Sequence, residues 1–346
     1  MGTSQEGREL ASQRDLAGEV EWALSKLGLE DFHRNALTTL AEVGAPADPV
    51  QLPPPAAAAA LFDRLGLASR DIKEAVAARP DRRRQPALWW LLERCHHRLL
   101  QRMGRTGDLG PWPSLPEEVG PAGRYLYIWV LLATVPAVGR YHRERGISEE
   151  TSWETMSALG AQVANHRALF GTGGLHTQEW MTVHFRGLLY ALGRLYFERL
   201  PIWFDAAGSA GGRLLPQRGD WSLGVHIPEG RLTPEACEAS FARARAFFPR
   251  HFPGEDYRYA TCVSWILDPQ LEEYLSPATN IVQFQRRFTL LPAGEASDNA
   301  TVVEFVFRRP LAELDDLPRG TTLQRAIVDH IRAGRHWKFR TGWFEL

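Results

Sequence analysis

The segments RLYFERLPIWF (residues 194–204) and WSLGVHI (residues 221–227) mark the place where the sequence changes from helical to strand-like character. Upstream of them, apolar residues recur at the spacing of an amphipathic helix. Within them, apolar residues alternate with polar ones or gather with β-branched and aromatic residues, which is typical of strands. We therefore predict an α+β protein, with a helical domain over residues 1–175 and an α/β domain with a mixed sheet over residues 176–346.

The helical part is divided by linkers that are rich in proline and glycine. Ser148 is a suitable N-cap for the helix that follows it, and the GTGG run at 171–174 should end that helix. From the helical spacing and these boundary signals we predict helices over residues 16–43, 57–66, 71–78, 86–103, 124–145, 149–170 and 176–192.

The second half mixes strands with helices whose starts are marked by capping residues. Thr233, Pro234 and Glu235 combine an N-cap, a first-turn proline and an acid near the positive end of the helix dipole. Thr321 and Gln324 form the pattern of a capping box. The remaining predictions are helices over 233–248, 268–275 and 321–334, strands over 257–267, 280–291 and 301–308, and an edge strand in the tail at 336–346.

Length and charge limit the possible architectures and partners. The 346 residues exceed the usual size of one compact core, so two packed domains with a cleft between them are expected. The 40 Lys and Arg against 41 Asp and Glu give a formal net charge of -1, which provides no overall field to attract nucleic acid or an anionic bilayer. The most apolar run, at 125–138, is too short to span a membrane and contains Pro136, so we expect a buried helix there.

The cysteines and the N-terminus bear on the compartment. Cys95, Cys237 and Cys262 are far apart and odd in number, and none belongs to a CxxC pair. Such usage fits a reducing environment. The polar, charged N-terminus has no apolar core followed by a cleavage site, so no signal peptide is expected. We therefore expect a cytoplasmic protein.

A pair of histidines on one predicted helix is the first candidate for chemistry, because the Walker A, Rossmann glycine, HExxH and GxSxG motifs are all absent. His176, Trp180 and His184 are spaced by four residues and would share one helix face. A neutral imidazole can take a proton from an amine near neutral pH, which makes His184 a candidate general base. The alternative is a buried histidine with a purely structural hydrogen bond, and His176 fits that alternative better.

Three further features are candidates for ligand binding. Trp153 and Trp180 could wall an apolar pocket, although tryptophans in helices are more often ordinary core residues. The turn VHIPEG (225–230), which contains His226, leads from a strand into a helix and would present backbone N–H groups to anions such as the CoA pyrophosphate. Acidic residues in and after the turn oppose that interpretation. Ser264, on the next predicted strand, is a candidate hydrogen-bond donor.

Two other clusters are weaker. Glu93, His96 and His97 are close in sequence, but two ligands without an identifiable further partner do not make a metal site, and none is predicted. The three arginines at 82–84 are either a solvated cluster or contacts for CoA phosphates.

Four stretches of the chain carry a resemblance to a known family. They are EWMTVHFRGLLYALGRLYFE (179–198), GVHIPEGRLTPEACEASFARARAFFPRHFP (224–253), SWILDPQLEEYLSPATNIVQFQRRF (264–288) and TTLQRAIVDHIRAG (321–334). In this order they resemble acyltransferases that have an N-acyltransferase N-terminal domain and a GNAT-like C-terminal domain. The best-understood members acylate glycopeptide antibiotics of the teicoplanin type.

The resemblance implies a ternary complex in which acyl-CoA lies between the two domains and an acceptor amine attacks the thioester directly. In the antibiotic-tailoring members, the acceptor is the 2-amino group of a glucosamine on a peptide aglycone, and the donor is a long-chain acyl-CoA. His184, in the matching VHFRG segment, looks like the base, and Trp153 and Trp180 look like walls of the donor pocket. The Arg/Gln-x-x-Gly-x-Gly/Ala pyrophosphate loop of ordinary GNAT enzymes follows no predicted strand here, so CoA should use another surface, for which His226 and Ser264 are candidates.

The leading hypothesis is therefore an acyl-CoA-dependent N-acyltransferase with a histidine base and no metal. Two alternatives stay open: a catalytically silent protein that senses acyl-CoA, and a helical interaction module that binds no CoA. The acceptor, the acyl-chain length, the oligomeric state and the pathway are not determined by the sequence.

Overall fold

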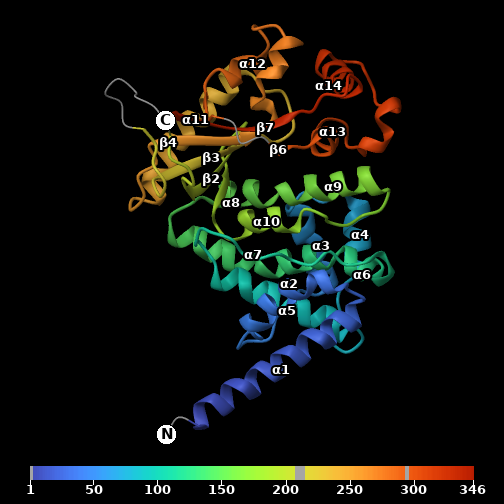
Figure 1. Cartoon of the computed structure of the whole chain (residues 1–346). Coiled ribbons are helices and arrows are strands. Elements are labelled where there is room, and N and C mark those ends of the chain that lie inside the picture. The colour runs from blue at the N-terminus through green and yellow to red at the C-terminus, as the bar shows by residue number, and fades with distance from the viewer. Residues whose placement is uncertain (1–2, 207–214, 293–295) are drawn as a thin grey trace. The chain divides into compact units, whose positions relative to one another are not determined.

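The computed structural model describes the backbone of residues 3–206, 215–292 and 296–346 (Figure 1). The chain divides into two compact units: a helical unit, Met1–Glu144 with Ser148–Gly187, and a sheet unit, Arg145–Ile147 with Leu188–Leu346. The division after Gly187 lies beyond the boundary at residue 175 that we expected from the sequence. The reason is the helix α10 (Gln178–Phe185), which packs on helices α7 and α8 of the helical unit.

The helical unit is organised around α7, whose residues from Leu126 to Leu132 are all buried, in agreement with the buried helix expected at 125–138. Trp129 packs edge-to-face on Phe62, with ring centroids 5.2 Å apart. The helices are α1 (Thr3–Leu27), α2 (Arg34–Val43), α3 (Pro55–Arg64), α4 (Ser69–Ala77), α5 (Pro86–Gln101), α6 (Pro121–Arg124), α7 (Leu126–Glu144), α8 (Glu149–Met156), α9 (Ala158–Phe170) and α10, with short 3-10 turns η1 (Asp31–His33) and η2 (Glu117–Val119).

Three predicted helices differ in extent. The helix expected over 16–43 is interrupted at Gly28, which has a positive φ of 64°. The one expected over 149–170 is two helices, α8 and α9, because the start of α9 meets the loop after α3: the Gly160 amide donates to the Leu65 carbonyl at 3.0 Å, and a Cβ on Gly160 would lie 2.0 Å from the Gly66 oxygen. The one expected over 176–192 is only α10, because the chain then enters a strand.

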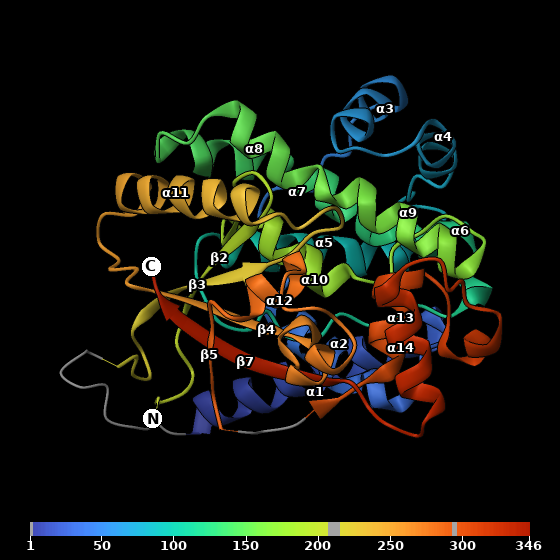
Figure 2. The ribbon, with the colours of Figure 1, turned by 90° about the horizontal axis from the view of Figure 1, so that it is seen from above.

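The sheet unit contains a mixed sheet with the strand order β1-β2-β3-β4-β7-β5, and β6 also pairs with β7. Every pair is antiparallel except β3 with β4, which is parallel. Helix α11 (Pro234–His251) covers one face of the sheet (Figure 2). Its Phe241 contacts Phe197 of β2 and Phe344 of β7, with ring centroids 5.6 and 5.2 Å apart. The strands are β1 (Leu189–Ala191), β2 (Tyr196–Pro201), β3 (Trp221–His226), β4 (Tyr259–Ser264), β5 (Thr289–Leu290), β6 (Ala296–Ser297) and β7 (Lys338–Glu345).

The strands predicted at 194–204, 221–227 and 257–267 are confirmed with shorter bounds, but two others were wrong. Residues 280–285 form helix α12, and only a short β5 follows it. The stretch predicted as a strand at 301–308 lies in helix α13 (Asn299–Phe307), which Asp298 caps and which buries Val302 and Val303. The hydrophobic core around these two valines also contains Ile327 of α14 (Thr322–Arg332) and Trp337. Burial against these neighbours overrides the β preference of the valines.

The prediction for the C-terminal tail was also wrong. We expected an edge strand at 336–346, but β7 lies inside the sheet, between β4 and β5. The short helix expected over 268–275 is a 3-10 turn, η4 (Pro269–Glu273), preceded by η3 (Trp265–Leu267) and accompanied further on by η5 (Leu311–Asp316).

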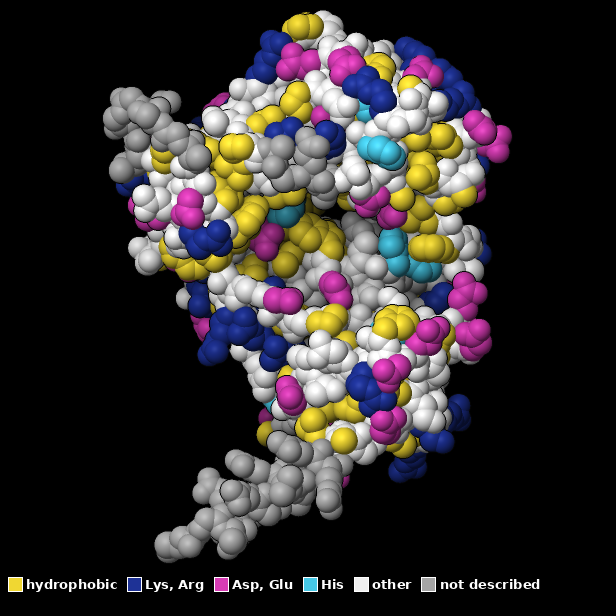
Figure 3. Space-filling model, viewed as in Figure 1, with side chains coloured by type: hydrophobic (Ala, Val, Ile, Leu, Met, Phe, Trp, Pro, Cys, Tyr) yellow, Lys and Arg dark blue, Asp and Glu magenta, His cyan; other side chains and the backbone are white. Residues whose placement is uncertain are grey.

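Charged side chains of both signs lie on the surface of the protein. On the face shown in Figure 3, basic and acidic side chains are interspersed. Across the described parts of the chain, no helix has both the length and the apolar character needed to cross a bilayer.

Candidate active site

His184 lies on the last turn of α10 in the helical unit, and only 1% of its surface is exposed. Its imidazole meets the indole of the half-buried Trp180 edge-to-face, with ring centroids 5.1 Å apart at an interplanar angle of 86°. This contact fixes the plane of the imidazole against a rigid aromatic wall. The predicted proximity of these two side chains is therefore confirmed.

The VHFRG segment that carries the resemblance is anchored from both sides. The Arg186 guanidinium donates to the Gly107 carbonyl at 3.0 Å, and the Gly104 amide donates to the Arg186 carbonyl at 2.7 Å. Gly187 has a positive φ of 68°, and a Cβ there would lie 2.2 Å from a ring carbon of Tyr141. The segment thus needs arginine and glycine at these positions to hold the end of α10, and with it His184.

His176 does not share a face with His184, because α10 begins only at Gln178. Its ring instead packs beside Phe170 and His166, with centroids 5.3 and 5.6 Å apart. Burial lowers the pKa of His166, whose Nδ1 lies 2.8 Å from the Thr172 carbonyl oxygen. These histidines belong to the junction after α9.

Trp153, on α8, lies in a charged cluster. The Arg64 guanidinium stands 3.8 Å from the centre of its ring, and its indole N–H donates to Glu149 at 3.1 Å. The same carboxylate accepts from Arg64 at 2.9 Å. Trp153 is also half-buried against the core of the helical unit. One ring face is therefore occupied by a cation, which leaves its role as a pocket wall a prediction.

His226 ends β3 and is paired with a residue that the sequence analysis did not identify. Its Nε2 lies 2.9 Å from Oε2 of Glu198 on β2. The two strands are antiparallel, with Glu198 opposite Gly224 and Tyr196 opposite His226, so Glu198 and His226 share one face of the sheet. Alternation within RLYFERLPIWF places Glu198 and Phe197 on opposite faces of the strand, so the sequence marks Glu198 as a polar position. Its partner, however, depends on how the strands pair.

The turn after His226 is held by arginines of the sheet unit. Arg194 donates to the carbonyls of Gly230 and Arg231 at 2.8 and 2.9 Å. Glu229, which should repel a phosphate, is paired with Arg308. The predicted helix start is confirmed, since Thr233 Oγ1 accepts from the Ala236 amide at 3.2 Å and Pro234 is the first residue of α11.

Ser264 ends β4, and its hydroxyl oxygen accepts from the Ile266 amide at 3.2 Å, which caps η3. A hydroxyl that accepts one hydrogen bond can still donate another. On the same strand, Cys262 is buried whereas Val263 is half exposed. Burial raises the pKa of the Cys262 thiol to about 12, which fits a packing residue rather than a nucleophile.

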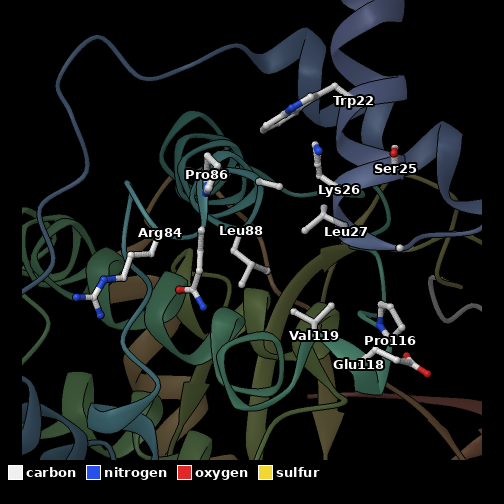
Figure 4. Close-up of a pocket in the computed structure, with 13 residues that line it drawn as sticks. Trp22, Ser25, Lys26, Leu27, Arg84, Pro86, Leu88, Pro116, Glu118 and Val119 are labelled. Atoms are coloured by element: carbon white, nitrogen blue, oxygen red, sulfur yellow. The ribbon is translucent and has the colours of Figure 1, made fainter.

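A separate cavity of about 630 Å³ lies between α1, η2 and the start of α5 (Figure 4). Trp22, Lys26 and Leu88 line it, and of the candidate site residues only Arg84 does. Arg84 is at its edge, with the guanidinium directed away from the other labelled side chains. The Asp81 carboxylate accepts from the backbone amide of Arg84 at 2.8 Å, so the arginines at 82–84 belong to the turn that begins α5.

The described residues include no group of three or more His, Cys, Asp or Glu side chains that could hold a metal ion.

The two units match two domain families. Residues 56–187 match the N-acyltransferase N-terminal domain and residues 189–344 the GNAT-like C-terminal domain. Together, the two matches define the class of the protein as an acyltransferase.

Solved structures give the closer relationship. The chain is 45% identical to an acyltransferase mutant in complex with octanoyl-CoA, over 95% of this chain and 99% of that one, with a TM-score of 0.85. It is equally identical, over the same shares, to an acyltransferase in complex with decanoyl-CoA and teicoplanin, with a TM-score of 0.84, and to one in complex with CoA and 10C-teicoplanin, with a TM-score of 0.85. Among curated proteins, no match is found. The chain belongs to the family of acyltransferases that join an N-acyltransferase N-terminal domain to a GNAT-like C-terminal domain.

Proposed function

We propose that this protein transfers an acyl group from acyl-CoA to an amine of a teicoplanin-type glycopeptide, by direct attack of the amine on the thioester in a ternary complex. The observation that carries the proposal is 45% identity over 95% of the chain to an acyltransferase solved with decanoyl-CoA and teicoplanin. The amine of an amino sugar is the acceptor that this chemistry suits, because it is a stronger nucleophile than a hydroxyl once it has lost its proton.

His184 is the proposed general base. Its support is the anchored VHFRG segment and the rigid contact with Trp180, which together fix the imidazole. General-base catalysis of this kind contributes about 10²–10⁴-fold to a rate. A protonated amine has no lone pair for attack, so the base must act before or during formation of the C–N bond.

Four residues are the proposed contacts for the donor. Trp153 and Trp180 supply aromatic surface in the helical unit, and His226 and Ser264 supply polar groups in the sheet unit. The last two end the parallel strands β3 and β4, whose ladder stops at the pair Gly224 and Thr261 although β3 continues to His226 and β4 to Ser264. Ligands of sheet proteins commonly bind beyond the carboxyl ends of parallel strands.

A cytoplasmic location is part of the same proposal. It is supported by three free cysteines, all buried, which fit a reducing compartment.

The test is a free-thiol release assay with acetyl- to decanoyl-CoA and amino-sugar glycopeptide aglycones, with the product identified by mass spectrometry. His184→Gln should lower kcat by about 10²–10⁴-fold while the Kd for acyl-CoA stays unchanged. The matched control is His330→Gln, since His330 is also buried but lies in the sheet unit, stacked on Trp337 at 3.9 Å. Acyl-CoA binding without product would favour a sensor of acyl-CoA, and no binding at all would refute the proposal.

A further inference from the structure

Glu198 and His226 form an imidazole–carboxylate pair that the proposed function has not used. The Nε2–Oε2 distance is 2.9 Å, and the side chains keep 18% and 31% of their surface exposed, respectively. The pair is therefore sheltered enough for the charges to interact, while part of the imidazole stays accessible to a ligand. An imidazole that is oriented by a carboxylate through one nitrogen is the arrangement that enzymes use to hold histidine ready for proton transfer.

The residue between the partners makes room for the contact. Gly224 lies opposite Glu198 and two residues before His226, on the same face of the sheet. A Cβ on Gly224 would lie 3.5 Å from the Glu198 Cβ, 3.6 Å from His226 Nε2 and 2.5 Å from a methyl of Leu200. Diagonal partners on antiparallel strands are farther apart than direct partners. Because Gly224 has no side chain, Glu198 and His226 can approach each other to hydrogen-bonding distance.

The pair also lies on the side of the sheet that α11 does not cover. Phe197, which precedes Glu198, points to the other face and packs on Phe241 and Phe248 of α11, with centroids 5.6 and 6.4 Å apart. His226 is the last residue of β3, beyond the point where the parallel ladder to β4 stops. Both features place the imidazole at the carboxyl end of the parallel strand pair, where we have proposed that the donor binds.

Charged residues close to the pair in sequence have partners of their own. Tyr196 lies opposite His226 on β2. Arg194 is bound to the carbonyls of Gly230 and Arg231, and Glu229 to Arg308. The Glu198 carboxylate, in contrast, is hydrogen-bonded to His226 itself.

We propose that His226, positioned by Glu198, protonates the sulfur of CoA as the thioester breaks. The proposal rests on the acyltransferase function proposed above. The amine nitrogen bonds to the carbonyl carbon and gives up a proton to the base, and the C–S bond breaks with its electron pair on sulfur. That sulfur takes the proton from Nδ1 of the His226 imidazolium, while Nε2–H stays bonded to Glu198. The products are an amide and CoA thiol, and the neutral His226 imidazole then regains a proton from solvent.

The experiment compares two donors with leaving groups of different acidity. With decanoyl-CoA, His226→Gln should lower kcat by about 10–100-fold, the lower end of what proton transfer contributes, because a thiolate is already a fair leaving group. The S-phenyl thioester of decanoic acid releases a more acidic thiol, which leaves without a proton. With this donor, the kcat of His226→Gln should be within about 3-fold of that of the unaltered protein. An equal loss with both donors, or no loss with either, would overturn the proposal.

Glu198→Gln tests the positioning residue and does not depend on the aryl donor being accepted. The amide keeps a hydrogen bond to the imidazole but carries no charge, so kcat with decanoyl-CoA should fall by about 10-fold while the KM for decanoyl-CoA is unchanged. The Kd for decanoyl-CoA should stay unchanged, which also shows that the variant is folded. The control is Glu313→Gln, which removes a carboxylate from a surface pair with Arg309. An unchanged kcat in Glu198→Gln overturns this inference alone, whereas no acyl transfer by the unaltered protein overturns the proposed function and this inference together.

Discussion

Replacement of Arg167 by methionine should strongly destabilise the helical unit. Arg167 on α9 holds two carboxylates of α4: its Nε donates to Asp71 at 2.9 Å, and its Nη2 donates to Glu74 at 2.8 Å. The Tyr125 hydroxyl also donates to Glu74 at 2.9 Å. The Asp71 side chain is only 4% exposed, against 18% for Arg167 and 34% for Glu74. The guanidinium is therefore the positive charge that makes a buried aspartate tolerable.

The magnitude follows from this geometry. Breaking a buried ion pair costs about 3–5 kcal/mol, because the remaining charge stays buried without compensation. The exposed part of Arg167 and Glu74 lets water screen some of that loss, which lowers the expected cost to about 2–4 kcal/mol. A second change, Asp71→Asn, removes the stranded charge and should restore about 1 kcal/mol or more, as a non-additive pair.

The same cluster makes the free energy of unfolding depend on pH. The hydrogen bond from Arg167 is the main cause that lowers the pKa of Glu74 from 4.5 to about 2. Because the pKa is lower in the folded state, its stabilising contribution is fully present above pH 4.5 and is lost as the pH falls toward 2. Arg167→Met should remove most of that slope.

The assay is urea unfolding at pH 7 and pH 3, with hydrogen exchange to follow the helical unit separately from the sheet unit. The control is Arg34→Met, which breaks pairs with Glu21 and Asp31 whose side chains are mostly exposed, and which should leave the urea midpoint nearly unchanged. Equal midpoints for Arg167→Met and this control would refute the reasoning.

Other predictions concern single positions. Gly187→Ala should lower the free energy of unfolding by about 1–2 kcal/mol from the positive φ alone, and should reduce acyl transfer because Tyr141 is displaced. The control is Gly18→Ala, whose Cβ would meet nothing within 4 Å and which should impair neither stability nor activity. Burial lowers the pKa of His330 below 6.5, so the stability that the neutral imidazole provides is lost as the pH falls below that value. His330→Gln should therefore make the free energy of unfolding less dependent on pH between pH 7 and pH 5. Cys262 should react with an aromatic disulfide reagent only after unfolding, and rapid labelling of the native protein would contradict its burial.

Local signals in the sequence located most helix boundaries. The N-caps Ser148 and Thr233 and the capping box of Thr321 and Gln324 are all present in the structure. Gly171 ends α9 in the left-handed conformation, as the GTGG run suggested. These features are predictable because each depends on hydrogen bonds within a few residues.

The β-rich stretches were less reliable. Residues 301–308 read as a strand, yet α13 forms there because burial of Val302 and Val303 beside Trp337 outweighs their intrinsic preference. The tail read as an edge, yet β7 pairs with β4 and β5. A strand's position in a sheet depends on partners distant in the chain, which no local pattern reports.

By itself, the sequence determined the α+β class, the change from helices to strands, the capped helix starts and the family, because periodicity, caps and ordered motifs are all properties of the chain's own order. The tertiary structure decided which polar groups meet. It separated His176 from His184 and brought Glu198 to His226 across two strands. The physical reason is that strand register and the length of α10 are set by packing with distant segments, so contacts between candidate site residues are known only once the chain has folded.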